Sequence, residues 1–262
     1  MLLAEPASTP YDLNFRLLGI PVRVAPWFWL VALLLGWNLT KVGDQQAMLL
    51  TLWVASVFLS ILIHEMGHAL AMRFYGMDSH IVLYQFGGLA VPDQFSMRSS
   101  FRPRRMRDDP VSQIVISAAG PAAQLGLALA IALILKLSGF RMSFPVPYLE
   151  SVISLQEGRA IDSRPLEFLL FFLMLTSVLW ALLNLLPVYP LDGGQIARNV
   201  FSLYNPVAGI FFSLILSVVT GVAVAVYAFS RQDLFLAVMF ALLAFSSFQV
   251  LQAYSGRGGY GP

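Results

Sequence analysis

Long apolar runs separated by short polar connections dominate the chain. Each of six runs is near the length that a helix needs to cross the hydrocarbon layer of a bilayer. The polar break between the last two runs is short, since it extends only from Ser230 to Asp233. The six runs cover about residues 24–40, 48–72, 111–137, 167–187, 205–229 and 233–252.

One connection has a different pattern from the rest. Residues 77–95, MDSHIVLYQFGGLAVPDQF, contain two short runs of β-branched and aromatic residues around Gly87 and Gly88. This arrangement is typical of a β-hairpin. We therefore expect an all-α integral membrane protein with about six transmembrane helices and a small membrane-associated β-hairpin between the second and third helices.

The N-terminal segment is not typical of a signal peptide. Residues 1–23 lack an apolar stretch of the required length and are interrupted by Pro6, Pro10 and Pro21. We expect them to be a cytoplasmic or interfacial segment that precedes one membrane core, residues 24–252. Residues 253–262 are then expected to form a C-terminal tail.

The composition supports a membrane protein. Of the 262 residues, 58% are hydrophobic and only 11% are charged, whereas about a quarter of the residues in a soluble domain are charged. There is no cysteine, which excludes disulfides, thiolate metal sites and thiol nucleophiles. Any bound metal must therefore have nitrogen and oxygen ligands.

The basic residues predict an orientation. With the N-terminus inside, the cytoplasmic segments hold ten of the sixteen Lys and Arg residues, many of them in FRPRRMR at 101–107. By the positive-inside rule we expect a cytoplasmic N-terminus, and we expect the protein in the cell membrane. The basic stretch at 102–107 favours contact with anionic lipid rather than with nucleic acid.

The second apolar run contains the motif HEMGH, with His64, Glu65 and His68. Ionisable groups inside a membrane are costly and need partners. Residues four apart lie on one helix face, so the two imidazoles can bind one metal ion. Glu65 lies next to the first ligand, where a general base can reach a metal-bound water. His64 precedes Arg73 by roughly 13 Å of helix, which predicts a site in the cytoplasmic half of the membrane.

A catalytic zinc site needs a third protein ligand, and Asp192 is the strongest candidate. It lies in NLLPVYPLDGG at 184–194, where Pro187 and Pro190 must end the helix. Irregular backbone at membrane depth is tolerated only where protein covers it or where it lines an aqueous cavity. In the predicted topology both motifs reach the cytoplasmic half. At this point Asp192 is also interpretable as a helix-terminal residue at the interface.

These two motifs resemble those of the site-2 proteases, zinc metalloproteases that cut transmembrane substrates within the bilayer. HEMGH matches H-E-x-x-H, and NLLPVYPLDGG matches the Asn-x-x-Pro-x-x-Pro-x-Asp-Gly motif. GIPVRVAPWFWL, QFGGLA and SAAGPAAQLGLA are weaker matches. The resemblance implies one Zn²⁺ per chain and these roles: His64, His68 and Asp192 as zinc ligands, Glu65 as the group that activates water, and Asn184 as a residue that binds the substrate carbonyl or stabilises the oxyanion.

The resemblance also implies roles for other segments. The strands at 80–91 are expected to pair with an unwound substrate segment, whereas His80 is expected to be an interfacial histidine without a chemical role. Gln124 stands where the family commonly has Asn, so its contact near the site is expected to shift. We expect a minimal form without a PDZ or CBS domain. In a bacterium, anti-sigma proteins would be the substrate class.

Three other functions are compatible with parts of the sequence. A polytopic transporter or metal channel predicts ionisable residues spread over several spans, whereas here they gather at two points. A zinc-binding inactive scaffold is not favoured, because Glu65 is present, but only an activity assay excludes it. A metalloprotease completed by a glutamate ligand is disfavoured by the Asp-Gly motif. The expected partners are a membrane-protein substrate and the lipid bilayer, and the sequence leaves the substrate's identity and the oligomeric state open.

Overall fold

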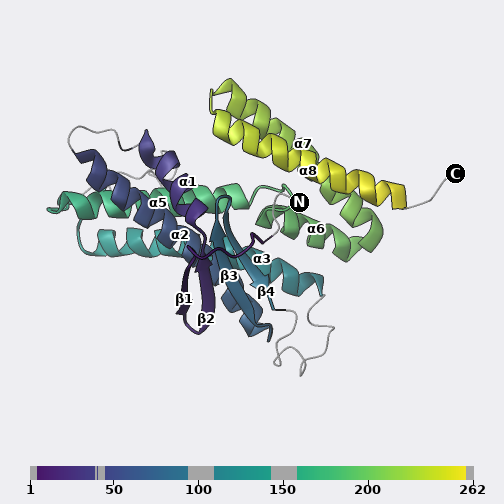
Figure 1. Ribbon diagram of the computed structural model, residues 1–262, viewed down its shortest axis with the longest axis horizontal. Helices are drawn as coiled ribbons and strands as arrows, with labels where there is room; N and C mark the ends of the chain where they lie inside the picture. The colour runs from purple at the N-terminus through teal and green to yellow at the C-terminus, as the bar shows by residue number, and fades with distance from the viewer. Residues whose placement is uncertain (1–4, 39, 41–44, 94–108, 143–157, 258–262) are drawn as a thin grey trace. The chain divides into compact units, whose positions relative to one another are not determined.

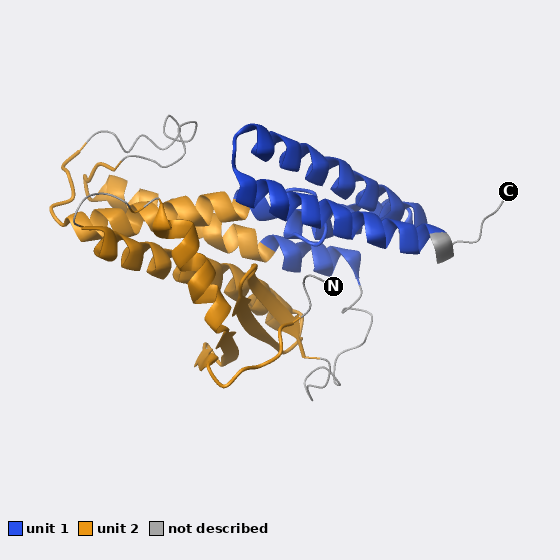
Figure 2. Ribbon diagram, turned by 45° about the horizontal axis from the view of Figure 1, so that its top comes forward, with its two compact units in different colours: residues 1–4, 100–118, 182–262 blue, residues 5–99, 119–181 orange. Residues whose placement is uncertain are grey.

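The structure, a computed structural model, describes residues 5–38, 40, 45–93, 109–142 and 158–257. The chain forms two compact units, which are coloured separately in Figure 2. Unit 1 comprises Met1–Ala4, Ser100–Ala118 and Leu182–Pro262, and unit 2 comprises Glu5–Ser99 and Ala119–Ala181. The basic stretch at 101–107 and much of the expected external loop at 138–166 lie outside the described residues.

Most described residues are helical, and five helices are long and apolar enough to cross a membrane. The first predicted run instead gives a helix of 12 residues, α1. At 1.5 Å per residue it is roughly 18 Å long, short of the roughly 30 Å hydrocarbon layer, so the expected count of six spans is not confirmed. The helices, labelled in Figure 1, are α1 (Pro26–Trp37), α2 (Gln46–Phe74), α3 (Pro110–Leu137), α5 (Arg164–Asn184), α6 (Asp192–Tyr204), α7 (Pro206–Ser230) and α8 (Leu234–Arg257).

The expected hairpin is present, but it is half of a four-stranded sheet. The strands are β1 (Leu13–Leu17), β2 (Ile20–Val24), β3 (Ser79–Tyr84) and β4 (Gly87–Pro92), in the spatial order β1-β2-β3-β4 (Figure 1). The all-α expectation is therefore corrected to a mostly helical fold with a small sheet. The N-terminal segment, which was not expected to form strands, supplies β1 and β2. Strand β2 pairs with its neighbour β1 and also with β3, which lies far along the chain.

Strands β2 and β3 are parallel, while the two outer pairings are antiparallel. The backbone N–H of Ala25 donates to the carbonyl of Leu83, which continues the pairing up to the start of α1. After β2 the chain therefore leaves the sheet, forms α1 and α2, and returns to the sheet as β3. The N-terminal hairpin and the β3–β4 hairpin consequently form one sheet within unit 2.

The β3–β4 turn differs in detail from the prediction. Gln85 and Phe86 form the turn, while Gly87 and Gly88 are already part of β4. Gly87 has a φ of +117°, which only glycine adopts readily. A Cβ at this position would also lie about 2.5 Å from the ring of Trp180. The glycines are therefore needed for backbone conformation and close packing rather than for the turn itself.

Unit 2 has a continuous apolar core between α1, α2, α5 and the sheet. Trp53 packs edge-on against Phe172, and its indole N–H donates to the Ala32 carbonyl 2.9 Å away. In unit 1, α7 and α8 run side by side as an antiparallel pair, and Gly221 allows close contact with Ala244. The outward faces of these helices carry many exposed large apolar side chains, as expected for surfaces that meet lipid.

Candidate metal centre and active site

The HEMGH motif lies in the later half of α2, and its three ionisable side chains are buried. Their exposed fractions are 3% for His64, 4% for Glu65 and 7% for His68. The Nε2 atoms of the two histidines are 3.1 Å apart. Two nitrogens that bind one tetrahedral zinc ion at about 2.0–2.1 Å are roughly 3.3 Å from each other. The imidazole pair therefore fits a shared zinc ion, as the four-residue spacing predicted.

Helix α3 packs against α2 beside the two histidines, and two residues of α3 face them. Gly120 lies against the imidazole of His68, where a Cβ would overlap the ring. Four residues later, Gln124 places its Oε1 2.9 Å from Nδ1 of His64. Both pairs are four residues apart, which is one helical turn on each helix. The contact that was expected to shift on replacing Asn by Gln is therefore made by Gln124 with good hydrogen-bond geometry.

The general-base candidate, Glu65, lies beside the sheet. Gly88 on β4 faces it so closely that a Cβ there would overlap the carboxylate side chain. Tyr84 also lies close: burial, and secondly the charge of Glu65, raises the pKa of the Tyr84 phenol to about 12. The phenol is therefore protonated at neutral pH. Within the described sheet β4 is an outer strand, so this outer strand passes directly beside Glu65.

The second motif lies in unit 1. As predicted from Pro187 and Pro190, the chain leaves helical structure after Asn184, the last residue of α5, and a new helix begins at Asp192. Asp192 is half-buried in the first turn of α6. Gly193 and Gly194 follow inside this turn and are buried.

The non-helical segment between α5 and α6 is fixed by side chains of later helices. Ser217 on α7 accepts a hydrogen bond from the backbone N–H of Tyr189 at 3.0 Å. Ser247 on α8 donates to the carbonyl of the same residue at 2.8 Å. A Cβ on Gly193 would overlap the Leu185 carbonyl, so glycine allows α6 to start close against this segment. Both backbone polar groups of Tyr189 are thus satisfied, as irregular backbone in an apolar protein requires.

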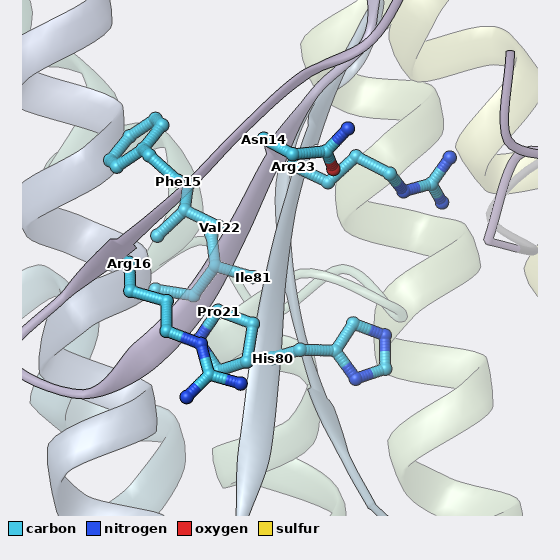
Figure 3. A pocket seen from close by; sticks show the side chains of 8 residues that line it. All are labelled: Asn14, Phe15, Arg16, Pro21, Val22, Arg23, His80 and Ile81. Carbon is cyan, nitrogen blue, oxygen red and sulfur yellow. The ribbon is translucent and has the colours of Figure 1, made fainter. Parts of the chain in front are cut away.

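His80 lies apart from the histidine pair and takes part in a surface network of charges. Its Nδ1 is 2.7 Å from Oδ1 of Asp93, and its Nε2 is 3.4 Å from Oε1 of Glu5. Arg23 pairs with Glu5 and with Asp12. This network ties residues 5–12 to the sheet, and the absence of a chemical role for His80 stays a prediction. The adjoining pocket has a volume of about 460 Å³. Figure 3 shows the side chains that line it: Asn14, Phe15, Arg16, Pro21, Val22, Arg23, His80 and Ile81.

Comparison with known protein families gives one decisive match. The model of Peptidase family M50 matches residues 52–207, more than half of the chain, including both motifs. The chain belongs to Peptidase family M50. This confirms the family expected from HEMGH and NLLPVYPLDGG.

Two curated relatives share a modest part of their sequence with this chain. A protein of Synechocystis sp., provisionally named as a zinc metalloprotease, is 30% identical over 193 residues, which is 70% of this chain and 42% of the relative. A zinc metalloprotease of Methanocaldococcus jannaschii is 25% identical over 190 residues, 72% of this chain and 44% of the relative. The chain therefore matches less than half the length of these relatives.

A solved structure shows the same fold. The site-2 protease from Methanocaldococcus jannaschii superposes with a TM-score of 0.53 at 20% sequence identity, over 92% of this chain and 95% of the other. The mostly helical membrane architecture with a small sheet is thus shared with that protein.

The five residues singled out from the sequence remain predictions as site residues, and the groups that the structure places around them were not predicted. The structure places His64, Glu65 and His68 in unit 2, and it places Asn184 and Asp192 in unit 1. The residues that pack around the histidines and Glu65 were missed, and so were the serines beside Tyr189. The sequence held a signal for Gly120: its four-residue spacing from Gln124 equals the spacing of His64 and His68, as packing of two helices side by side would require. The missed residues are Tyr84, Gly88, Gly120, Ser217 and Ser247.

Proposed function

We propose that this M50 protein is an intramembrane zinc endopeptidase that cuts peptide bonds in or near transmembrane segments of other membrane proteins. One observation carries the proposal most: an adjacent, buried His-Glu-x-x-His group lies within a long apolar helix. Such groups are costly in an apolar span and mark functional sites. The names of the two relatives, which specify zinc metalloproteases, agree with this function.

The proposed zinc site uses His64 and His68 with Asp192 as the third ligand. Asp192 is suited to the role by its carboxylate, by its position after a break in the helical chain and by the motif that contains it. Asn184, at the end of the preceding helix, is proposed to bind the substrate carbonyl or to stabilise the oxyanion. When bound, zinc would supply a Lewis acid and a water of lowered pKa.

The chain's own residues would perform the proton transfers. Glu65 would accept a proton from the attacking water and return it to the leaving amine. Its proximity to the outer strand β4 suits this role, because a substrate segment added to that strand would pass beside the carboxylate. A transmembrane helix must first unwind, since its amide groups are otherwise held in internal hydrogen bonds.

We further propose that the protein lies in the cell membrane with its N-terminus and its active site towards the cytoplasm. The excess of basic residues in the corresponding segments supports this orientation. Since β2 and β3 share one sheet, the N-terminal hairpin and the hairpin beside Glu65 would lie on this same side.

The function is tested with purified protein in liposomes and a panel of tagged single-span membrane proteins. We expect cuts inside or beside the spans, located by mass spectrometry, and their loss in Glu65→Gln or after treatment with a zinc chelator. Cleavage that persists in both conditions, or that falls only in soluble domains, would contradict the proposal.

A further inference from the structure

A chain of buried polar side chains from three helices lies behind His64. Gln124 on α3 contacts His64 at 2.9 Å, and its Nε2 donates to the backbone carbonyl of Ser60 at 3.1 Å and to the Ser60 hydroxyl at 2.9 Å. Ser177 on α5 donates to the same hydroxyl at 3.1 Å. Ser60, Gln124 and Ser177 are fully inaccessible to solvent. All four residues belong to unit 2.

The Ser60 carbonyl fixes the orientation of the Gln124 amide. A backbone carbonyl only accepts hydrogen bonds, so the amide group that faces it must be the NH₂. The amide oxygen of Gln124 then faces His64, and this oxygen also only accepts. His64 must therefore carry its proton on Nδ1 and donate it to Gln124.

This tautomer has a direct consequence for metal binding. With the proton on Nδ1, the Nε2 atom of His64 bears the free lone pair, and this is the atom that lies 3.1 Å from Nε2 of His68. Metal-ligating histidines characteristically donate their other ring N–H to an acceptor that sets both tautomer and ring orientation. Gln124 occupies the place of such an acceptor.

We propose that Gln124 is a positioning residue that holds His64 in the Nδ1–H tautomer and aims its Nε2 at the metal. The inference rests on the proposed zinc function. The side chain of Gln124 reaches both His64 and Ser60 from α3. Ser177 supports the arrangement by donating to the hydroxyl that Gln124 also uses.

The test compares three variants of the full chain in detergent. Gln124→Met keeps the size of the side chain but removes the acceptor, whereas Gln124→Glu keeps an acceptor for His64 and, when protonated, a donor for the Ser60 carbonyl. Gln249→Met is the matched control, because Gln249 lies on an exposed part of α8. Thermal unfolding of the metal-free proteins establishes that each variant is folded.

The first measurement is the zinc dissociation constant by competition with a chromogenic chelator. We expect Gln124→Met to raise it by roughly 10- to 100-fold. Gln124→Glu is expected to stay within about threefold of wild type, and the control is expected to be unchanged. A dissociation constant for Gln124→Met within twofold of wild type would overturn the proposal.

The second measurement is independent of zinc and of cleavage. The ¹⁵N chemical shifts of His64 in metal-free protein, assigned with a His64→Gln variant, report which ring nitrogen carries the proton. We expect the Nδ1–H form in wild type and in Gln124→Glu, and a mixture of both tautomers in Gln124→Met. A mixture already present in wild type would overturn the inference, even where Gln124→Met fails to fold. Wild-type protein that shows the expected tautomer but binds no zinc would instead contradict the proposed function.

Discussion

The residues expected to bind zinc come from two regions that are held in place in different ways. On the histidine side, a side chain is positioned by another side chain: Gln124 bonds the ring of His64. On the aspartate side, later helices hold the backbone: Ser217 and Ser247 bond the N–H and the carbonyl of Tyr189, three residues before Asp192. A helix already satisfies its own backbone, so only the side chains of α2 need partners, whereas a broken helix needs partners for its main chain.

This difference shows what α7 and α8 contribute. Neither helix supplies a residue of the two motifs, yet each provides one serine that stabilises the segment leading to Asp192. Their remaining surfaces are largely apolar and exposed. The histidine side, in contrast, depends on α3 and β4, which approach α2 closely at three glycines: Gly67 on α2, Gly120 on α3 and Gly88 on β4.

The largest effect is expected from Glu65→Gln. Loss of a general base typically lowers a reaction rate by about 10²- to 10⁴-fold, while the amide has nearly the size and shape of the carboxylate. Cleavage of a substrate found in the panel should therefore disappear, whereas zinc per chain, measured by elemental analysis, should stay at the wild-type value. Retained cleavage would show that another group acts as the base.

A smaller effect is expected from Gly88→Ala, which tests the close approach of β4 to α2. The added methyl group would overlap the Glu65 side chain and displace it, and displacement of a reacting group by about 1 Å can reduce a rate by roughly 100-fold. We expect cleavage to fall by roughly 10- to 100-fold with little change in zinc content. Gly126→Ala on α3 is the control, since a Cβ there meets nothing within 4 Å. Equal activities of the two variants would refute the proposed contact.

The aspartate side is tested by Ser217→Ala and Ser247→Ala. Each substitution leaves a backbone group of Tyr189 without its partner, which should cost about 0.5–1.5 kcal/mol of stability. Thermal unfolding in detergent measures the change. Ser213→Ala is the control, because its hydroxyl bonds only to Ile210 of its own helix in the described contacts. If the double variant unfolds at the same temperature as the control, the two serines do not stabilise this segment.

The smallest effect is expected at Asp12, which directly precedes β1 in unit 2 and belongs to neither motif. Hydrogen bonds from the hydroxyl and then the backbone N–H of Thr9, together with Arg23, lower the pKa of Asp12. A lowered pKa in the folded state stabilises the fold above the unfolded value of about 3.9 and loses this effect as the pH falls through the folded value. Asp12→Asn should therefore cost less than about 1 kcal/mol at pH 7, and this difference should vanish as the pH falls below the folded-state pKa of Asp12. A pH-independent difference in unfolding temperature would contradict this account.

The sequence predicted the chemistry better than the packing. HEMGH and the Pro187, Pro190 and Asp192 pattern are local signals, because helical spacing and proline geometry depend on neighbouring residues. The pairing of β2 with β3 and the contact of Gly88 with Glu65 join distant segments, and no local pattern encodes them. The span expected at about 24–40 is not confirmed for a related reason: apolar composition indicated a span, but composition alone does not determine where a helix ends.

The central claim is that two motifs far apart in the sequence serve one zinc ion. The most direct measurement is zinc per chain, by elemental analysis of detergent-purified wild type beside His68→Ala and Asp192→Ala. We predict about one zinc per chain in wild type and a large loss in both variants. Zinc content that is unaffected by Asp192→Ala, in protein shown to be folded, would contradict the claim and separate the two motifs.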